Sequence, residues 1–272
     1  MSGILYVTGT PIGNLSDLSP RAAQTLAEVD FIAAEDTRVT LKLLNHLGIK
    51  KPMVSYYEHN KRERGEIICK RIEQGESCAI VTDAGMPCIS DPGEDLIKLC
   101  AERGIKTVVV PGPSAVVSAL AVSGLDTGRF TFEGFLSVNK KSRSEHLQSL
   151  LHEKRTMIFY EAPHKLPATL RDFYDAFGDR RLSIVRELTK IHEEVIRTTT
   201  RAAAEQLADG SIKGEIVLVL EGAREEEKKY TLQNAVELAK ELIASGEKTT
   251  EAAKQAAAAT GFKKNEIYRE LI

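Results

Sequence analysis

The first 122 residues alternate short apolar runs with segments whose apolar residues recur at helical spacing. The apolar runs are 4–8, 31–35, 53–56, 78–82 and 105–110. Runs this short predict buried strands, and the segments that follow them predict helices at 20–28, 37–47, 63–74, 94–103 and 114–122. Repeated strand–helix units of this kind predict a mainly parallel sheet with helices on both faces.

A polar break at 125–129 separates this half from a second strand–helix segment. Strands are predicted there at 130–135, 156–160, 182–185, 195–199 and 216–220, with helices at 144–151, 167–176 and 201–207. We place a domain boundary at the break, so that 1–124 and 125–223 are two α/β domains. Two domains joined by a short linker commonly hold a ligand in the cleft between them.

The last part of the chain begins with a run of charged residues, 224–229, which is typical of a solvated linker. Three short helices are predicted after it, at 231–244, 250–259 and 263–271. We treat 224–272 as a separate helical module. Its short helix, glycine turn and basic last helix resemble a helix-turn-helix, and an ordinary helical cap on the core is the alternative.

Three predicted strands of the first half end in loops that are rich in glycine and proline: 9–15, 83–93 and 111–115. A strand, such a loop and then a helix are how an α/β sheet builds a ligand site at the carboxyl ends of its strands. We therefore expect these loops to be edges of one pocket. The first loop has Pro11 where a dinucleotide-binding Rossmann loop has glycine, and the sequence contains no P-loop nucleotide motif.

Composition narrows the functional class only a little. The chain of 272 residues is 42% hydrophobic and has a formal net charge of −2. This charge does not indicate a polyanion partner, but it does not exclude one, because a local basic patch can bind phosphates. We expect no signal peptide, because Met1-Ser2-Gly3 leads directly into a predicted strand, and no membrane span, because no apolar run approaches about 20 residues. The four cysteines lack C-x-x-C spacing, so we expect reduced thiols, a cytoplasmic location and no bound metal.

The loops belong to a longer series of short motifs that occur in a fixed order. They are Gly9-Thr10-Pro11-Ile12-Gly13-Asn14-Leu15, Ala34-Glu35-Asp36-Thr37-Arg38, Asp83-Ala84-Gly85-Met86-Pro87, Ser90-Asp91-Pro92-Gly93, Pro111-Gly112-Pro113-Ser114-Ala115, Phe132-Glu133-Gly134-Phe135-Leu136, Glu161-Ala162-Pro163-His164, Arg186-Glu187-Leu188-Thr189-Lys190 and Gly214-Glu215. This series resembles the class III, tetrapyrrole-methylase-like S-adenosylmethionine methyltransferases, and among them the ribosomal RNA small-subunit methyltransferases. The resemblance covers essentially the whole chain; Thr82, where many members have serine, is a small departure.

The resemblance implies a fold and a reaction. The fold would be two unlike α/β domains with S-adenosylmethionine in the cleft between them, followed by the helical module. The reaction would be methyl transfer to the ribose 2′-hydroxyl of a cytidine in the decoding region of small-subunit ribosomal RNA, within the assembled small subunit. The enzyme would be a homodimer without a membrane partner.

The resemblance also implies which residues face the methyl donor. By similarity to tetrapyrrole methylases these are Pro11, Asp83, Ala84, Gly85, Cys88, Ser114, Ala115, Glu161, Ala162 and Leu188. Backbone groups of a Gly/Pro loop can bind a carboxylate and an amine without side-chain bulk. Ser114 is expected at a helix N-terminus, where N–H groups without helical partners suit a polar ligand.

Catalytic residues are less sharply indicated. A ribose 2′-hydroxyl is a poor nucleophile, so we expect a nearby base to assist it. Asp36, Glu187 and Lys190 follow or end predicted strands, and each is a candidate base or orienting group. For each of them the alternative is an ion pair or a surface charge.

RNA contacts are expected from basic residues at three places. They are Arg38 and Lys42 on one helix face, Lys140, Lys141, Arg143 and His164 in the second domain, and Lys263, Lys264 and Arg269 on the last helix. A phosphate backbone needs several such charges together, whereas single surface charges are usually only solvated.

The sequence also allows other functions. One is a methyltransferase of the same fold that acts on a tetrapyrrole or another small molecule, for which the helical tail would have no use. Another is a nucleic-acid-binding protein without enzymatic activity, which would have no use for the three Gly/Pro loops. A Rossmann methyltransferase, with Glu35 holding the ribose of the methyl donor, is disfavoured by Pro11.

Overall fold

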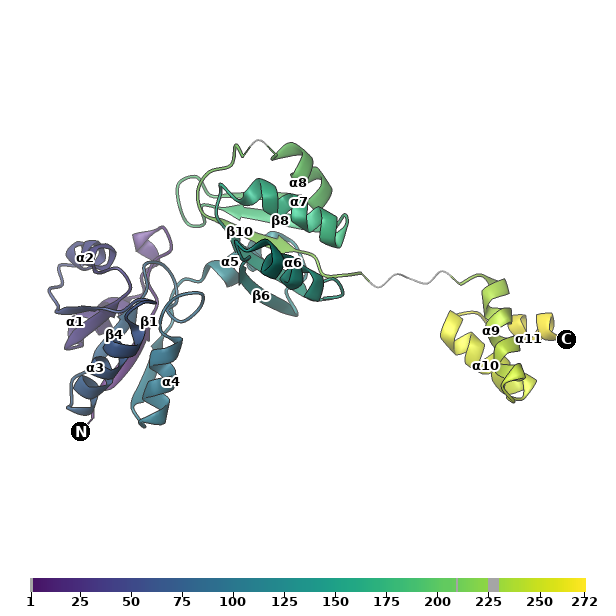
Figure 1. The fold of residues 1–272 in the computed structure, drawn as a ribbon, viewed down its shortest axis with the longest axis horizontal. Coiled ribbons are helices and arrows are strands. Elements are labelled where there is room, and N and C mark those ends of the chain that lie inside the picture. The colour runs from purple at the N-terminus through teal and green to yellow at the C-terminus, as the bar shows by residue number, and fades with distance from the viewer. Residues whose placement is uncertain (1, 209, 225–229) are drawn as a thin grey trace. The chain divides into compact units, whose positions relative to one another are not determined.

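A computed structural model describes residues 2–208, 210–224 and 230–272. The chain forms two compact units, Met1–Ala223 and Arg224–Ile272. Within the described ranges, the first unit contains two five-stranded sheets with their helices, and the second contains three helices (Figure 1). The predicted α/β class with a helical C-terminal module is confirmed.

The first sheet is parallel throughout and has the strand order β3-β2-β4-β1-β5. Its strands are β1 (Ile4–Thr8), β2 (Phe31–Ala34), β3 (Met53–Ser55), β4 (Cys78–Val81) and β5 (Lys106–Val110). Its helices are α1 (Pro20–Glu28), α2 (Thr37–His46), α3 (Lys61–Glu73) and α4 (Glu94–Glu102), and a 3₁₀ helix, η1 (Leu15–Asp17), follows the first loop. Because β1 lies between β4 and β5, the three strand ends that carry Gly/Pro loops are neighbours.

Helices cover both faces of this sheet, as its apolar strands require. Phe31 and Ala33 of β2 pack in one cluster with α3 and α4, whereas Ile32 and Ala34 pack in another with α1 and α2. Successive strand residues point to opposite faces, so a strand that is buried on both sides is apolar at every position.

The second sheet is mixed and has the order β6-β7-β10-β8-β9. Strands β6 and β7 are parallel, and the remaining pairs are antiparallel. The strands are β6 (Phe130–Phe135), β7 (Thr156–Glu161), β8 (Arg181–Arg186), β9 (Glu194–Thr199) and β10 (Ile216–Leu220), and the associated helices are α5 (Ala115–Ser123), α6 (Lys140–Ser149), α7 (Leu166–Phe177) and α8 (Thr200–Gln206).

Helix α5 precedes the domain boundary that the sequence suggests, yet it packs on the second sheet. Val116 and Leu120 of α5 share a buried cluster with Ile158, Val185 and Val217, on the face opposite α6, α7 and α8. The helix therefore joins the two sheets, and the boundary after residue 124 stays a prediction.

Helix α6 begins four residues earlier than the predicted start at 144. The side chain of Asn139 accepts hydrogen bonds from the N–H groups of Lys141 and Ser142, which makes Asn139 the N-cap. Lys140, Lys141 and Arg143 thus lie on the first turn of a helix rather than in a loop before it.

The second unit is a small helical bundle. Its helices are α9 (Leu232–Ala244), α10 (Thr249–Thr260) and α11 (Lys264–Leu271). Ala239 of α9, Ala253 of α10 and Ile267 of α11 form part of its own buried core. Gly261 adopts a left-handed conformation (φ 79°) and ends α10, as the glycine turn of the sequence predicts. The predicted run 224–229 includes residues 225–229, which lie outside the described residues.

Candidate functional site

The loops that follow β1, β4 and β5 contact one another. The Thr10 N–H donates to the Gly85 carbonyl oxygen at 2.9 Å, and the Gly85 N–H donates to the Thr10 carbonyl oxygen at 3.2 Å. Gly9 and Gly112 pack backbone to backbone: a Cβ atom added to Gly9 would lie 2.7 Å from the Gly112 Cα atom. The three loops therefore meet at one place, as the sequence predicts.

The Gly9–Gly112 contact predicts that adding a side chain at Gly112 destabilises the fold. In Gly112→Ala, the new Cβ atom would lie 2.8 Å from the Gly9 Cα atom, and backbone cannot yield as a flexible side chain does. We expect a loss of about 1–3 kcal/mol in the free energy of unfolding, measured by urea denaturation. Gly128→Ala is the control, since its nearest contact is a side-chain oxygen at 3.3 Å; equal losses in both variants would contradict the tight contact.

A cleft of about 500 Å³ lies beside these loops and is lined by loops that follow strands of the first sheet and by strands of the second sheet. A volume of this size suits a cofactor or small molecule. The lining residues are Ile12, Glu35, Asp83, Ala84, Ser90, Asp91, Ala115, Phe135, Tyr160, Glu161, Ala162, Pro163, Val185, Leu188, Gly214, Glu215, Ile216 and Val217.

The predicted methyl-donor residues are distributed unevenly around this cleft. Asp83, Ala84, Ala115, Glu161, Ala162 and Leu188 line it. Pro11, Gly85, Cys88 and Ser114 belong to the same loops but are not among the lining residues. Gly85 is occupied in the contact with Thr10 and has a φ of 89°. As methyl-donor contacts, all ten positions remain predictions.

Cys88 contributes packing rather than a reactive thiol. A Cβ atom added to Gly93 would lie 2.5 Å from the Cys88 Sγ atom, so the sulfur fills the space that this glycine leaves. Burial raises the pKa of the thiol to about 11, with smaller contributions from Asp91 and Glu94. The side chain is therefore a neutral thiol at physiological pH.

One wall of the cleft is acidic. Glu35, Asp83 and Asp91 line it, and the Thr82 hydroxyl donates to the Glu35 Oε2 atom at 2.5 Å. Burial raises the pKa of Asp83, and Glu35 adds to the shift. Burial, followed by repulsion from Glu35, raises the pKa of Asp91 to about 6, although Thr82 opposes the shift. A carboxylate wall of this kind favours a cationic ligand.

Sequence reasoning missed several lining residues. Asp91, Phe135 and Tyr160 were present in or beside the quoted motifs, but none was singled out as a site residue. Tyr160 and Phe135 pack together, with ring centroids 5.4 Å apart, and Phe135 remains 59% exposed. The available signal was position, because Phe135 and Tyr160 are aromatic residues at the ends of the predicted strands 130–135 and 156–160.

Backbone strain is concentrated in two loops of this region. Among the described residues, the non-glycine residues with positive φ are Cys88 (71°), Ser90 (61°), Glu187 (53°) and Thr189 (66°). Ser90 lines the cleft, and Leu188 lies between the other pair. Such conformations persist only where the surroundings enforce them, and they gather at ligand sites.

The three candidate bases are all held in ion pairs. Asp36 caps α2 and binds Arg38 through both oxygens, and these contacts lower the pKa of Asp36 to about 2. The Glu187 Oε1 atom accepts from the Glu215 N–H and from Lys190 Nζ, both at 2.9 Å, which lowers the pKa of Glu187. Desolvation lowers the pKa of Lys190, but Glu187 and Glu215 together outweigh it, so the pKa is raised. None of the three lines the cleft.

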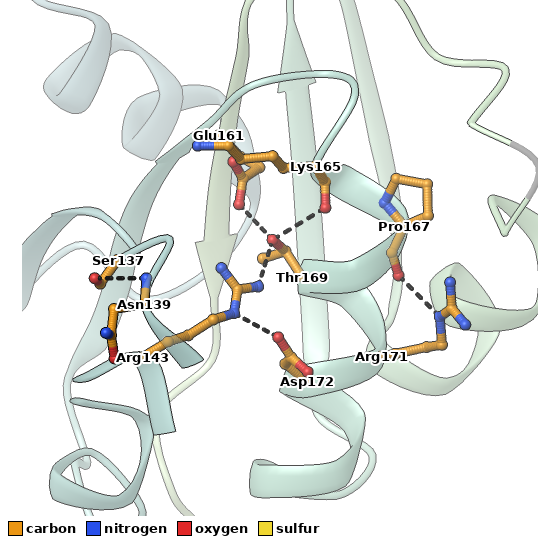
Figure 2. A network of polar contacts seen from close by, with 9 residues as sticks. All are labelled: Ser137, Asn139, Arg143, Glu161, Lys165, Pro167, Thr169, Arg171 and Asp172. Atoms are coloured by element: carbon orange, nitrogen blue, oxygen red, sulfur yellow. Dashed lines mark hydrogen bonds and ion pairs between the residues drawn. The ribbon is translucent and has the colours of Figure 1, made fainter. Parts of the chain in front are cut away.

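The predicted RNA-binding residues differ in their availability. Lys42, Lys140, His164 and Lys263 are exposed, as is Arg269, whereas Lys264 is half-buried. Lys141 lies 3.8 Å from Glu145, and the exposed Arg38 guanidinium is bound to Asp36. Arg143 is only 14% exposed and is engaged in a polar network (Figure 2).

That network ends at the cleft carboxylate Glu161. The Arg143 guanidinium donates to Asp172 at 2.5 Å and to the Thr169 hydroxyl at 2.8 Å, and Thr169 in turn donates to the Glu161 Oε2 atom (Figure 2). The other carboxylate oxygen, Oε1, accepts from the Ala162 N–H at 2.8 Å. Glu161 is 5% exposed, so these partners hold a nearly buried carboxylate in place.

The described residues contain neither a metal-binding cluster nor a membrane-spanning helix. In this part of the chain, no group of three or more His, Cys, Asp or Glu side chains is arranged to hold a metal ion. None of the described helices has the length and apolar character needed to span a bilayer.

Comparisons with known proteins agree on one family. The model of the "Tetrapyrrole (Corrin/Porphyrin) Methylases" matches residues 4–204. A protein of Synechocystis sp. named "Ribosomal RNA small subunit methyltransferase I" is 44% identical over 269 residues, which are 98% of this chain and 96% of the relative. A protein of Thermotoga maritima with the same name is 48% identical over 220 residues, which are 81% of this chain but 99% of the relative.

Because almost all of the Thermotoga relative is matched, about fifty residues of this chain have no counterpart in it.

Among solved structures, a cobalamin biosynthetic enzyme, cobalt precorrin-4 methyltransferase, superposes with a TM-score of 0.60. It covers 80% of this chain and 94% of its own chain at 18% identity. That likeness supports the fold alone.

Proposed function

Because the chain belongs to the tetrapyrrole (corrin/porphyrin) methylase family, we propose that it is an S-adenosylmethionine-dependent methyltransferase of small-subunit ribosomal RNA. The proposed acceptor is the ribose 2′-hydroxyl of a cytidine in the decoding region. The observation that carries this proposal is 44% identity, over 98% of the chain, to a relative whose name states that substrate. The 18% identity to the precorrin enzyme supports no substrate.

The cleft fits the proposed methyl donor. Ile12, Leu188 and Val217 offer apolar contacts to an adenosine, and Glu35, Asp83 and Asp91 offer negative charge to an ammonium or sulfonium group. When bound, S-adenosylmethionine supplies an electrophilic methyl carbon on a positively charged sulfur. The strained loops around Ser90 and Leu188 orient both walls, and holding reactants in line provides much of the acceleration in such a transfer.

We propose Asp91 as the residue that takes the proton from the acceptor hydroxyl. It lines the cleft, and none of its described neighbours is a cation bound to its carboxylate. Asp36 and Glu187, by contrast, lie outside the cleft and are held in ion pairs. A general base works best when its pKa is near the operating pH, and burial moves Asp91 in that direction.

We propose a cytoplasmic homodimer that acts on the assembled small subunit. The exposed apolar side chains of Val109 and Val117 offer part of a surface for the second copy. We expect no metal requirement for chemistry, because transfer from a sulfonium needs no Lewis acid.

Transfer of tritium from labelled S-adenosylmethionine tests the substrate class directly. The acceptors are naked ribosomal RNA, small subunits, whole ribosomes and uroporphyrinogen III. We expect label in RNA when small subunits are the acceptor. Label in the tetrapyrrole with none in any RNA would overturn the proposal in favour of a small-molecule methyltransferase.

We propose that the second unit, 224–272, helps to bind the substrate but takes no part in the methyl-donor site. The Thermotoga relative carries the same name but lacks a counterpart for about fifty residues of this chain, which is the size of this unit. We therefore infer that the unit is accessory to chemistry. Cutting the chain after Ala223 should leave donor affinity and kcat unchanged and raise the KM for small subunits by roughly tenfold, the effect of losing a few phosphate contacts.

Calorimetry and steady-state kinetics measure these values. Lys263→Ala/Lys264→Ala/Arg269→Ala in the intact chain should reproduce the KM effect with a shallower salt dependence. If the truncated enzyme methylates subunits with an unchanged KM, the unit is a structural appendage and the docking role is wrong.

A further inference from the structure

A second groove, of about 700 Å³, lies between α6 and α7. Lys140, His164 and Lys165 line it at one end, and Asp175 lines it farther along α7. Strands β6 and β7 are parallel and each leads directly into its helix, so α6 and α7 begin at the same edge of the sheet. The basic residues therefore gather where β7 ends at Glu161.

The described part of the chain leaves the positive charge at this end of the groove unpaired. Neither Lys140 nor Lys165 forms an ion pair among the described residues. The carboxylate of Asp172 lines the groove too, but the Arg143 guanidinium binds it at 2.5 Å. Asp175 lies ten residues beyond Lys165, a distance of about 15 Å along a helix. Of the two carboxylates that line the groove, Asp172 is thus already paired and Asp175 is distant, so neither competes for the two lysines.

One short segment connects this groove to the cleft. Glu161, Ala162 and Pro163 line the cleft, and the next two residues, His164 and Lys165, line the groove. A ligand that occupies the cleft therefore has the basic end of the groove as its immediate neighbour. Basic side chains beside the cleft suit a polymeric substrate, because a polymer such as RNA carries negatively charged phosphates on both sides of the reacting nucleotide.

We propose that the basic end of the α6–α7 groove binds a phosphate of the RNA strand next to the acceptor nucleotide, through Lys140 and Lys165. The inference rests on the proposed function and deepens it by locating the path of the substrate backbone. Val138, which is 80% exposed at the same groove, adds apolar contact for a neighbouring sugar or base.

Arg143 has a different role in this proposal. Its guanidinium is mostly buried and donates to Asp172 and Thr169, and Thr169 donates to Glu161 (Figure 2). A planar guanidinium can hold two partners at once, which the ammonium group of a lysine cannot do in the same geometry. Arg143 is therefore a positioning residue for the cleft carboxylate and not a phosphate ligand.

The test is Lys140→Gln/Lys165→Gln in the full-length chain, with binding to small ribosomal subunits measured by fluorescence titration at several salt concentrations. The control is Lys50→Gln/Lys106→Gln, which removes the same charge at exposed positions outside the groove. We expect roughly tenfold weaker binding in the groove variant and a salt slope shallower by about 0.7–0.9 per lysine. The control should match wild type, and donor affinity should be unchanged in both.

A groove variant whose affinity and salt slope equal those of the control would overturn the proposal. Because binding is measured without turnover, this outcome is separate from a failure of the proposed function. A wild-type protein that binds subunits through the groove but transfers no methyl group would refute the function and leave the phosphate site standing.

Arg143→Lys separates positioning from phosphate binding. This variant keeps the charge, so the salt slope should stay at the wild-type value while donor affinity or kcat falls several-fold. Thr169→Val should give the same loss without any charge change, and Thr169→Ser, which keeps the hydroxyl, should restore it. A shallower salt slope in Arg143→Lys, or a Thr169→Ser variant as impaired as Thr169→Val, would contradict the positioning role.

Discussion

Replacing Asp91 with asparagine is expected to lower the kcat of methyl transfer by about 10²–10⁴-fold, the usual contribution of a general base. Asparagine has nearly the same shape but cannot accept the proton of the 2′-hydroxyl. Donor binding should persist, because Glu35 and Asp83 remain on the acidic wall. Single-turnover kinetics and calorimetry measure the two effects separately.

The pH profile gives an independent check on the same residue. A base works only when ionised, so kcat/KM of the wild type should rise with pH through the Asp91 pKa of about 6 and level off above it. Glu35, Asp83, Tyr160 and Cys88 are the other titratable groups that interact with Asp91. In Asp91→Asn the rising limb should disappear.

Asp95→Asn is the matched control, since Asp95 is an exposed residue of α4 paired with Lys61. It should behave as wild type. If Asp91→Asn loses donor affinity at an unchanged kcat, then Asp91 binds the methyl donor and is not the base.

Enlarging Ala84 to leucine is expected to weaken S-adenosylmethionine binding by roughly 100-fold, which corresponds to about 2.7 kcal/mol. Ala84 lines the cleft and is exposed to it, so the added carbon atoms would occupy ligand space without overpacking the core. Titration calorimetry gives the affinity, and thermal unfolding checks that the fold is intact.

Ala101→Leu makes the same chemical change on the exposed surface of α4, outside the cleft. Its donor affinity should equal that of the wild type. Equal donor affinity in Ala84→Leu and wild type, with both folded, would place the methyl donor somewhere other than this cleft.

Much of the fold follows from local pattern. Each strand of the first sheet is predicted to within about a residue or two. Strands β2 and β4 are buried at every position and are therefore continuous apolar runs, and glycine or proline directly follows β1 and β5. The pattern does not encode strand order. The placement of β1 between β4 and β5, which brings the three loops together, comes from long-range pairing that no local signal contains.

The start of α6 shows how a local signal can be overlooked. A search for apolar spacing begins at residue 144, yet the N-cap Asn139 starts the helix before any apolar residue contributes. The packing of α5 on the second sheet could not be predicted from the sequence either. The helix is apolar all round, so its sequence does not distinguish which sheet it covers.

For the site, the sequence predicted the loops better than the side chains. Six of the methyl-donor residues predicted from the motif resemblance line the cleft. The motifs identify the loops by their place in the chain, and the backbone of those loops forms the cleft wall. The role of a carboxylate depends on its partners, which only the fold reveals. Asp36 and Glu187 look like bases in sequence and are ion-paired in the structure, whereas Asp91, flanked by Ser90 and Pro92, carries no such signal.

Alkaline hydrolysis locates the transferred methyl group and so tests whether the acceptor is a ribose 2′-hydroxyl. Small subunits labelled by the enzyme from tritiated S-adenosylmethionine are stripped of protein, and the RNA is hydrolysed to completion. A 2′-O-methyl group blocks cleavage of the adjacent phosphodiester bond. We expect tritium in one alkali-stable dinucleotide whose 5′ residue is cytidine. Tritium in mononucleotides, which would mean base methylation, would contradict it.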